Sequence, residues 1–234
     1  MSSARSDILA DISTAISKEI DKKSSLLERS LTQAKSRLTN HPPNLIPARG
    51  SLGIKARVDL FIREAERVNS TVARVSCLDG VPREIVRFLT KYNLPMTLKV
   101  SPETSGKIIP WSNQALLDVE VGSADGTEFS CVSNAIAGVA ETGTLVVISG
   151  RDSPTTLNFL PPTHFCLVNS SDIIGNYEEV WVRLRTEKQE DRNISFLPRT
   201  VNWITGPSRT ADIEQTLLLG AHGPQRLHIV IIDG

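Results

Sequence analysis

The sequence predicts an α/β fold in which a mostly parallel sheet is covered by helices on both faces. From residue 54 onward, segments with a helical apolar pattern alternate with short strand-like runs. These runs are rich in β-branched residues and are bounded by turn residues, as expected for strands. Such alternation is typical of βαβ units, whose helices lie on the two faces of a parallel sheet.

A helical extension precedes this alternation. Residues 5–39 are predicted to form a helix, because isoleucines recur at every fourth position: Ile8, Ile12, Ile16 and Ile20. Such an apolar stripe must be buried against another surface. It packs either on its own domain or, as a helical arm, on a second copy of the chain or a partner subunit, since soluble proteins often form symmetric oligomers.

Length and composition favour one folded domain after this extension. The chain has 234 residues, of which 40% are hydrophobic and 22% are charged, which is enough to bury one core. Residues 40–53 include the run His41-Pro42-Pro43 and are predicted to form a loop. We therefore expect a helical extension and loop at residues 1–49 and an α/β domain at residues 50–234.

The charge and hydropathy patterns argue against two classes of partner. Lys plus Arg and Asp plus Glu each number 26, so no excess of positive charge attracts a nucleic acid or an anionic membrane. No apolar run approaches the roughly twenty residues that span a bilayer, and the N-terminal residues do not resemble a signal peptide. We expect a cytoplasmic protein with no membrane span that binds no nucleic acid.

The cysteine and histidine patterns argue against a metal or cluster site in this chain. Cys77, Cys131 and Cys166 are widely spaced and odd in number, which fits neither a disulfide framework nor a four-cysteine iron-sulfur site. No two histidines have the helical spacing of a metal site. Any iron-sulfur chemistry is therefore expected in a partner protein.

The predicted elements of the α/β domain follow one another in a regular order. Strands are predicted at residues 71–76, 96–100, 116–121, 129–132, 145–149, 164–168, 200–204 and 227–232. Helices are predicted at residues 54–68, 81–92, 133–140 and 171–184, with a further one around Ile213, Leu217 and Leu218. The segment 133–140 is assigned to a helix because its small residues suit close packing against a sheet.

The first candidate site is the turn Gly206-Pro207-Ser208. With its flanking strands and the following helix, it has the pattern of a parallel β-α-β crossover, whose strand-to-helix turn lies at the carboxyl edge of the sheet where such folds bind ligands. Gly206 permits close approach to the backbone, and Ser208 either simply caps the helix or also holds an anion. Asp212 falls in the first helical turn, where a carboxylate complements the helix dipole.

The second candidate site is the run Glu141-Thr142-Gly143-Thr144, between the predicted helix 133–140 and the next strand. Gly143 suits the positive φ of a helix C-cap. Glu141 suits it less, because a carboxylate near the negative end of a helix is unfavourable by up to about 1 kcal/mol. This misfit indicates a functional role for Glu141.

Three blocks of the sequence carry a family resemblance. The first contains Gly206-Pro207-Ser208, Thr210, Asp212-Ile213-Glu214, Gly220 and His222-Gly223-Pro224. The second runs from Ala135 to Val146, and a weaker third is Pro161-Pro162-Thr163-His164. Together they resemble the lactate utilisation protein C family, also called the LUD domain family, over roughly residues 50–234. The resemblance implies a three-layer, Rossmann-like fold similar to the NagB/RpiA/CoA-transferase group.

The resemblance also implies that the two candidate sites form one pocket. A helix-to-strand turn normally lies at the opposite sheet edge from a strand-to-helix turn, so we predict that the strand 145–149 runs antiparallel to the others. The pocket would hold a phosphate or carboxylate ligand, with Glu141 or His222 as the catalytic acid or base. The predicted ligand-binding residues are Thr142, Gly143, Thr144, Gly206, Pro207, Ser208, Asp212 and Gly223.

For function, the resemblance implies an accessory subunit of an L-lactate oxidation system. It would act with an iron-sulfur-cluster subunit and a cysteine-rich subunit, bind no redox cofactor itself, and be able to form a homo-oligomer. Two alternatives stay open, because a fold alone does not name a reaction. One is a free-standing enzyme of the CoA-transferase or sugar-isomerase kind, with Glu141 as nucleophile or base; the other is a structural adaptor.

Overall fold

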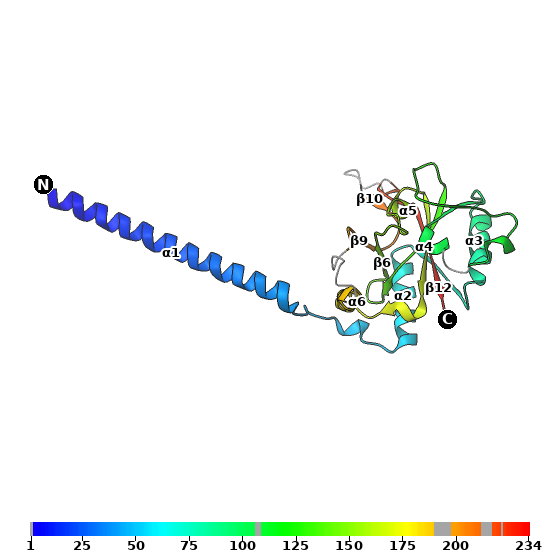
Figure 1. The fold of residues 1–234 in the computed structure, drawn as a ribbon, viewed down its shortest axis with the longest axis horizontal. Coiled ribbons are helices and arrows are strands. Elements are labelled where there is room, and N and C mark those ends of the chain that lie inside the picture. Colours follow the sequence, from blue (N-terminus) through cyan, green and yellow to red (C-terminus); the bar gives the residue numbers. More distant parts are fainter. Residues whose placement is uncertain (1, 106–108, 190–197, 212–216, 221) are drawn as a thin grey trace. The chain divides into compact units, whose positions relative to one another are not determined.

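The structure is a computed structural model of the whole chain (Figure 1). It describes residues 2–105, 109–189, 198–211, 217–220 and 222–234. Its contacts divide the chain into two compact units, Met1–Leu45 and Ile46–Gly234.

The first unit is a single long helix, α1 (Ser2–Asn40), which confirms the helix predicted over residues 5–39. Several of its leucines are more than half exposed: Leu9, Leu26, Leu27, Leu31 and Leu38. Within the described residues, no helix is both long enough and apolar enough to cross a bilayer. Which surface covers the apolar stripe of α1 stays a prediction.

The second unit is built on a six-stranded sheet whose strand pairs are all parallel. Its strands, in spatial order, are β1 (Thr71–Val75), β12 (Arg226–Ile232), β7 (Thr163–Asn169), β4 (Ser130–Asn134), β2 (Thr97–Val100) and β3 (Asp118–Val121). β12 and β7 lie near the middle and are almost entirely buried. The predicted parallel sheet is therefore confirmed.

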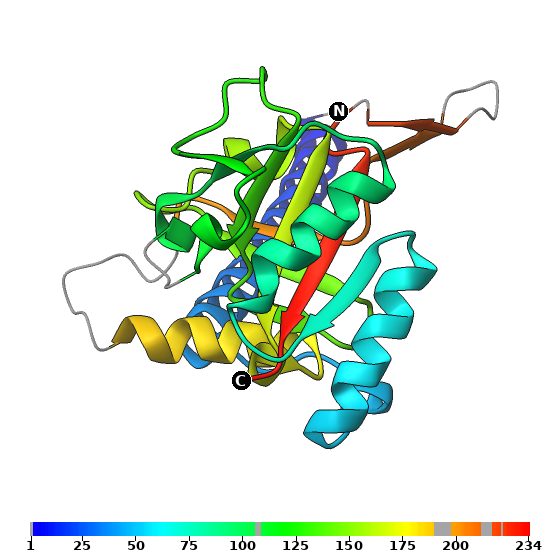
Figure 2. The ribbon, with the colours of Figure 1, turned by 90° about the vertical axis from the view of Figure 1, so that its right-hand side faces the viewer.

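Helices cover this central sheet on both faces. Alternate residues of β12 point to opposite sides: Ile229 and Ile231 pack in the cluster that contains α2 (Ile54–Arg67), whereas Val230 and Ile232 pack in the cluster that contains α3 (Gly80–Lys91). Figure 2 shows α3 lying in front of the strands. This two-sided burial confirms the three-layer, Rossmann-like class, because strands buried on both faces need a helix on each.

A second sheet of four strands packs beside α2. Its spatial order is β8 (Ile173–Ile174), β5 (Ala137–Val139), β6 (Thr144–Ile148) and β9 (Val201–Ile204). β6 is antiparallel to β5 and to β9, which confirms the predicted antiparallel strand but places it outside the central sheet. One face of β6 joins the α2 cluster, and the other packs against α6 (Tyr177–Gln189).

Two predicted helices in the middle of the chain need correction. Residues 133–140 form no helix, because they complete β4 and then form β5. The side chains of this segment are small because α2 packs directly on β5. A Cβ on Gly138 would lie 3.0 Å from the ring of Phe61, so glycine permits this close contact. The helix predicted at 171–184 begins only at Tyr177, since Ser170–Asp172 forms a 3-10 turn and β8 follows it.

The predicted β-α-β crossover near the C-terminus is also wrong. β9 and β12 belong to different sheets, and between them β10 (Arg209–Ala211) pairs antiparallel with β11 (Leu217–Leu219). A short apolar run fits a strand as well as a helix, so the spacing of these leucines could not decide between them. Residues 212–216, including Asp212, lie outside the described residues.

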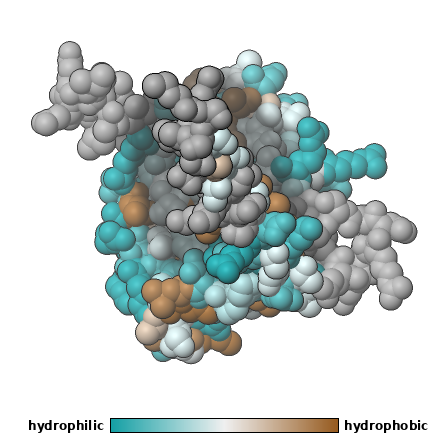
Figure 3. Space-filling view, turned by 90° about the vertical axis from the view of Figure 1, so that its left-hand side faces the viewer, coloured by the Kyte–Doolittle hydropathy of each residue, from teal (hydrophilic) through white to brown (hydrophobic). Residues whose placement is uncertain are grey.

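Short elements complete the second unit. They are the 3-10 turns Ala48–Gly50 and Trp111–Asn113, and the one-turn helices α4 (Pro102–Ser105) and α5 (Thr156–Phe159). On the face drawn in Figure 3, the coloured residues are mostly hydrophilic and the hydrophobic ones form small separate groups. Scattered apolar side chains of this kind are ordinary on protein surfaces.

A buried polar cluster lies between β4, β7 and α5. The hydroxyl of Ser133 donates to Oδ1 of Asn158 at 2.8 Å and lies 2.8 Å from Nε2 of His164. His164 is fully buried, and this burial lowers the pKa of its imidazole to about 4. A charged imidazole would lose its hydration here, so the folded protein holds His164 neutral.

We therefore predict that the free energy of unfolding falls on acidification. The pKa of His164 is lower in the folded state than the ordinary value near 6.5, so the unfolded chain binds the proton first. The contribution of His164 to the free energy of unfolding is fully present above about pH 6.5. This contribution, about 3 kcal/mol, is lost as the pH falls to about 4. Urea denaturation across this pH range measures the slope.

The variant His164→Gln should flatten this slope. Part of it will remain, because burial also lowers the pKa of His228. His222→Gln is the matched control, since the side chain of His222 is exposed and its loss should leave the slope intact. A His164→Gln protein that folds and keeps the full slope would contradict the prediction.

Candidate functional site

The Glu141-Thr142-Gly143-Thr144 run forms the tight turn of the β5–β6 hairpin. The backbone N–H of Gly143 donates to the carbonyl of Val139 at 2.9 Å, and Gly143 has a φ of +66°. A Cβ at this position would lie only 2.3 Å from the backbone nitrogen of Ala65. The prediction that Gly143 caps a helix is therefore wrong. Gly143 instead lets the hairpin turn contact the C-terminal end of α2.

The Gly206-Pro207-Ser208 turn reaches the same end of α2. Gly206 follows β9 with a φ of +78°, and a Cβ there would lie 2.4 Å from the carbonyl oxygen of Val68. The guanidinium of Arg209 donates to that same carbonyl at 2.6 Å, which places a cation at the negative end of the helix. Both candidate turns thus pack against one helix terminus.

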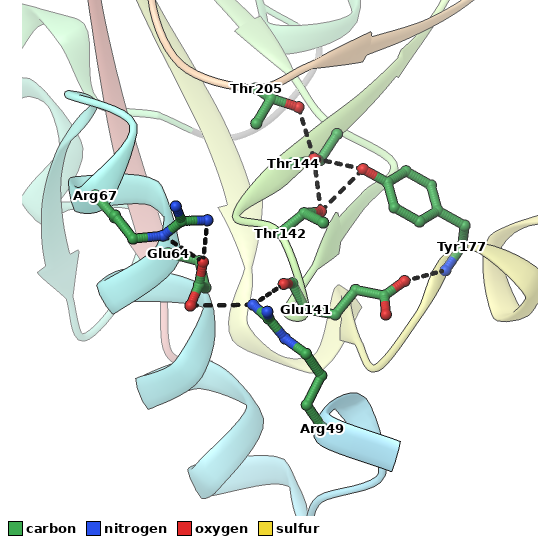
Figure 4. Close-up of polar contacts among 8 residues, drawn as sticks. All are labelled: Arg49, Glu64, Arg67, Glu141, Thr142, Thr144, Tyr177 and Thr205. Carbon is green, nitrogen blue, oxygen red and sulfur yellow. Dashed lines mark hydrogen bonds and ion pairs between the residues drawn. The ribbon is translucent and has the colours of Figure 1, made fainter. Parts of the chain in front are cut away.

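Hydroxyl groups join the two turns directly. Oγ1 of Thr144 lies 2.7 Å from Oγ1 of Thr205 and 2.7 Å from Oγ1 of Thr142. The phenol oxygen of Tyr177 lies 2.9 Å from Oγ1 of both Thr142 and Thr144. These four residues, shown in Figure 4, are called the hydroxyl cluster below. The two motifs are adjacent, as expected, whereas a ligand pocket shared between them stays a prediction.

Glu141 occupies a different electrostatic position from the predicted one. Its side chain is buried, and Oε1 accepts a hydrogen bond from the backbone N–H of Tyr177 at 3.3 Å. Tyr177 is the first residue of α6, so the carboxylate lies at the positive end of a helix, where it is favourable. The predicted misfit at a helix C-terminus is wrong, because no helix precedes Glu141.

An ion-pair chain lies next to Glu141. The guanidinium of Arg49 donates to the carbonyl oxygen of Glu141 and pairs with Glu64 at 3.0 Å, while Arg67 pairs with Glu64 at 2.8 Å (Figure 4). Desolvation raises the pKa of the Glu64 carboxyl, but the hydrogen bonds and charges of Arg67 and Arg49 outweigh it and leave the pKa lowered. Arg49 thereby ties the loop before α2 to the Glu141 turn.

Ser208 has a structural role that differs from the predicted helix cap. Its backbone N–H donates to the carbonyl of Pro224 at 2.8 Å, and its hydroxyl accepts from the backbone N–H of His222 at 3.3 Å. These bonds close the base of the β10–β11 hairpin. A Cβ on Gly223 would lie 3.4 Å from the Ser208 side chain, which places these residues side by side.

Not all predicted site residues come together. The side chain of His222 is exposed, and no hydrogen bond in the described part of the chain joins its imidazole to Glu141. Pro207 is half-buried between Gly206 and Ser208. Among the described residues, no group of three or more His, Cys, Asp or Glu side chains is arranged to hold a metal ion.

Sequence reasoning missed Tyr177 and Thr205, and it gave Arg49 little weight. Thr205 directly precedes the Gly206 turn, so its position was a usable signal. Tyr177 lies 33 residues after Thr144 in the chain, and its pattern resembled an ordinary core residue of a helix. What brings it to the site is the packing of α6 on the second sheet, which the sequence alone did not reveal.

The hydroxyl cluster is the part of the site best suited to binding. A hydroxyl group both donates and accepts hydrogen bonds and can rotate to suit a partner, so this cluster can donate to a carboxylate or contact an alcohol. Thr205 is exposed, whereas Thr144 is fully buried, and the cluster therefore runs from the surface into the protein. Glu141, in contrast, is already engaged at the start of α6.

We predict that Gly143→Ala and Gly206→Ala each destabilise the protein by about 3 kcal/mol or more, because a Cβ combines backbone strain with a clash against backbone atoms of α2. Gly126→Ala is the control: Gly126 has a φ of +101° but open space around it, so only about 1 kcal/mol of strain is expected. Urea denaturation measures the differences. Equal costs at all three positions would contradict the close packing.

Comparison with known proteins shows similarity to one protein family. Residues 130–232 match the LUD domain. An uncharacterized protein of Neisseria meningitidis, NMB1437, is 36% identical over 126 residues, covering 54% of this chain and 48% of that protein. Lactate utilization protein C of Anoxybacillus flavithermus is 38% identical over 96 residues, covering 41% of this chain and 40% of that protein. The alignments thus span about half the length of these relatives or less.

A solved structure supports the fold. The crystal structure of a DUF162 family protein from Deinococcus radiodurans has a TM-score of 0.58 to this structure, at 19% identity, covering 77% of this chain and 99% of that chain. At this identity the likeness bears on the fold alone. The LUD match includes both candidate turns and β4 to β12. The resemblance drawn from the sequence blocks is confirmed over residues 130–232, which match the LUD domain.

Proposed function

We propose that this chain takes part in lactate utilisation, as an accessory subunit of an L-lactate oxidation system. The observation that carries the proposal is its similarity, across the LUD domain, to several proteins named Lactate utilization protein C, from Anoxybacillus, Bacillus and other bacteria. Since the chain aligns with less than two thirds of each of these relatives, the complete activity is part of the proposal.

The redox chemistry is assigned to partner subunits. The chain contains 3 cysteines, too few for a four-cysteine iron-sulfur site, and two of them, Cys131 and Cys166, are buried between the strands and the covering elements. The proposed partners are an iron-sulfur-cluster subunit and a cysteine-rich subunit. This chain would contribute ligand binding rather than electron transfer.

The proposed ligand site is the hydroxyl cluster. Lactate carries a carboxylate and an alcohol, and both groups can exchange hydrogen bonds with Thr and Tyr hydroxyls. Thr205 connects the cluster to the surface, and Tyr177 presents its phenol to Thr142 and Thr144. Glu141 would act as a positioning residue, since it holds the start of α6 and thereby the backbone of Tyr177.

Reconstitution tests the accessory role. L-lactate-dependent dye reduction is measured with this chain alone, with the proposed partner subunits alone, and with all of them together. We expect activity only in the complete mixture. Partners that are fully active without this chain would overturn the proposal, and direct binding measurements with acyl-CoA and phosphosugar ligands would then test the enzyme alternative.

Tyr177→Phe tests the ligand site within the reconstituted system. Removing the phenol hydroxyl eliminates two hydrogen bonds but keeps the ring, so we expect a loss of about 1 kcal/mol in unfolding free energy and roughly a tenfold lower lactate-dependent rate. Tyr92→Phe on the surface is the matched control. A Tyr177→Phe protein with an unchanged rate would show that the cluster is only structural.

A further inference from the structure

A second polar site lies at the opposite end of the β6–β9 pair from the hydroxyl cluster. There, a cavity of about 670 Å³ is lined by residues that include Ser149, Arg151, Ser153, Thr156, Arg199 and Thr200. Ser149 directly follows β6 and Thr200 directly precedes β9. At about 3.3 Å per strand residue, Ser149 is roughly 16 Å along the strand from Thr144. The cavity is therefore separate from the site described above.

Backbone hydrogen bonds hold the walls of this cavity. The N–H of Ser149 donates to the carbonyl of Thr200 at 3.0 Å, and the N–H of Thr200 donates to the hydroxyl of Ser149 at 2.9 Å. Gly150 and Ser153 exchange two backbone hydrogen bonds, at 3.1 and 3.3 Å, and so close the turn that carries Arg151. The N–H of Glu103 donates to the carbonyl of Asp152 at 2.8 Å and anchors the same turn. The cavity is thus largely formed before any ligand enters.

The cavity is positively charged. Arg151 and Arg199 both line it, and no Asp or Glu is among the lining residues that the structure describes. Asp152 is next to Arg151 in sequence but lies outside the lining. Within the described ranges, neither arginine forms an ion pair with a carboxylate. Two unpaired guanidinium groups facing one cavity favour an anion, because each presents donors in a planar fork.

The remaining lining residues supply hydroxyl groups. Ser and Thr account for six of the described lining residues, none of which is aromatic. Oγ1 of Thr156 is buried and has no hydrogen-bond partner among the described residues. An unpartnered buried hydroxyl is costly and calls for a bonding group. Because Thr156 also lines the cavity, a change of its side-chain rotamer would let this hydroxyl bond an anion oxygen there.

We propose that this cavity binds the phosphate group of a small molecule. A phosphate offers more acceptor oxygens than a carboxylate, and the two arginines and the surrounding hydroxyls offer correspondingly many donors. The volume lies within the range of about 300 to 1,000 Å³ typical of small-molecule sites. The arginine and hydroxyl side chains of the described lining favour recognition through polar groups. This site is independent of the proposed role in lactate utilisation.

Isothermal titration calorimetry of the full chain, in a buffer free of phosphate and sulfate, tests the proposal. Inorganic phosphate, pyrophosphate and L-lactate are titrated separately. Saturable binding of pyrophosphate or phosphate that L-lactate does not displace is the expected result. Pyrophosphate binding without phosphate binding would identify a phosphate ester or diphosphate as the ligand type. No saturable binding of either anion, or displacement of the bound anion by L-lactate at a similar concentration, would overturn the proposal.

Arginine variants locate the binding. Arg151→Gln and Arg199→Gln should each raise the Kd about tenfold or more, through loss of charge-assisted hydrogen bonds. Arg83→Gln makes the same charge change at an exposed position on α3 outside the cavity and should leave the Kd unchanged. Equal weakening by all three variants would reveal general charge attraction and contradict a built site.

Thr156→Val gives a readout that does not depend on net charge. This change removes the unpartnered hydroxyl while keeping the branched shape, so the melting temperature without ligand should stay equal or rise. The Kd for the bound anion should rise about fivefold. Tyr177→Phe, which affects the hydroxyl cluster, should bind the anion like the unmodified chain. A failed lactate assay would therefore leave the conclusion on anion binding unchanged. An unchanged Kd for Thr156→Val would contradict the proposed contact between Thr156 and the anion.

Discussion

Two glycine turns meet the C-terminal end of α2 at distances that no other residue permits. A Cβ would lie 2.3 Å from the Ala65 nitrogen at Gly143 and 2.4 Å from the Val68 carbonyl oxygen at Gly206. Because the turns share this support, β6 and β9 are brought into register, and Thr144 meets Thr205. α2 itself packs in the core cluster that also contains Ile229 and Ile231 of the central sheet. The position of the hydroxyl cluster thus depends on one helix terminus.

The buried carboxylate of Glu141 is best understood as part of this framework. It accepts a hydrogen bond from the first residue of α6, while its own carbonyl accepts one from Arg49. A single residue therefore connects the hairpin turn, the loop before α2 and the start of α6. This role stabilises the site without requiring the carboxylate to react, and it leaves the Thr and Tyr hydroxyls as the groups available to a ligand.

The β6–β9 pair carries different chemistry at its two ends. One end presents neutral hydroxyls beside a buried carboxylate, and the other presents two arginines around a cavity. The β6 residues between them are buried against α2 on one face and against α6 on the other, whereas the β9 residues are half-buried. The two ends are separated by the length of β6, so a substitution at one end removes no contact at the other.

Local sequence patterns predict the α/β class, the long N-terminal helix, most strands of the central sheet and the family resemblance, because periodicity, turn residues and motif order are local properties. These patterns failed for residues 133–140 and for the segment after Ser208, where short runs of small or apolar residues fit helix and strand equally well. Long-range packing makes these segments strands, places Glu141 at the start of α6, and brings Tyr177 and Arg49 to the site. Each of these outcomes depends on contacts between residues far apart in the chain, which no local pattern records.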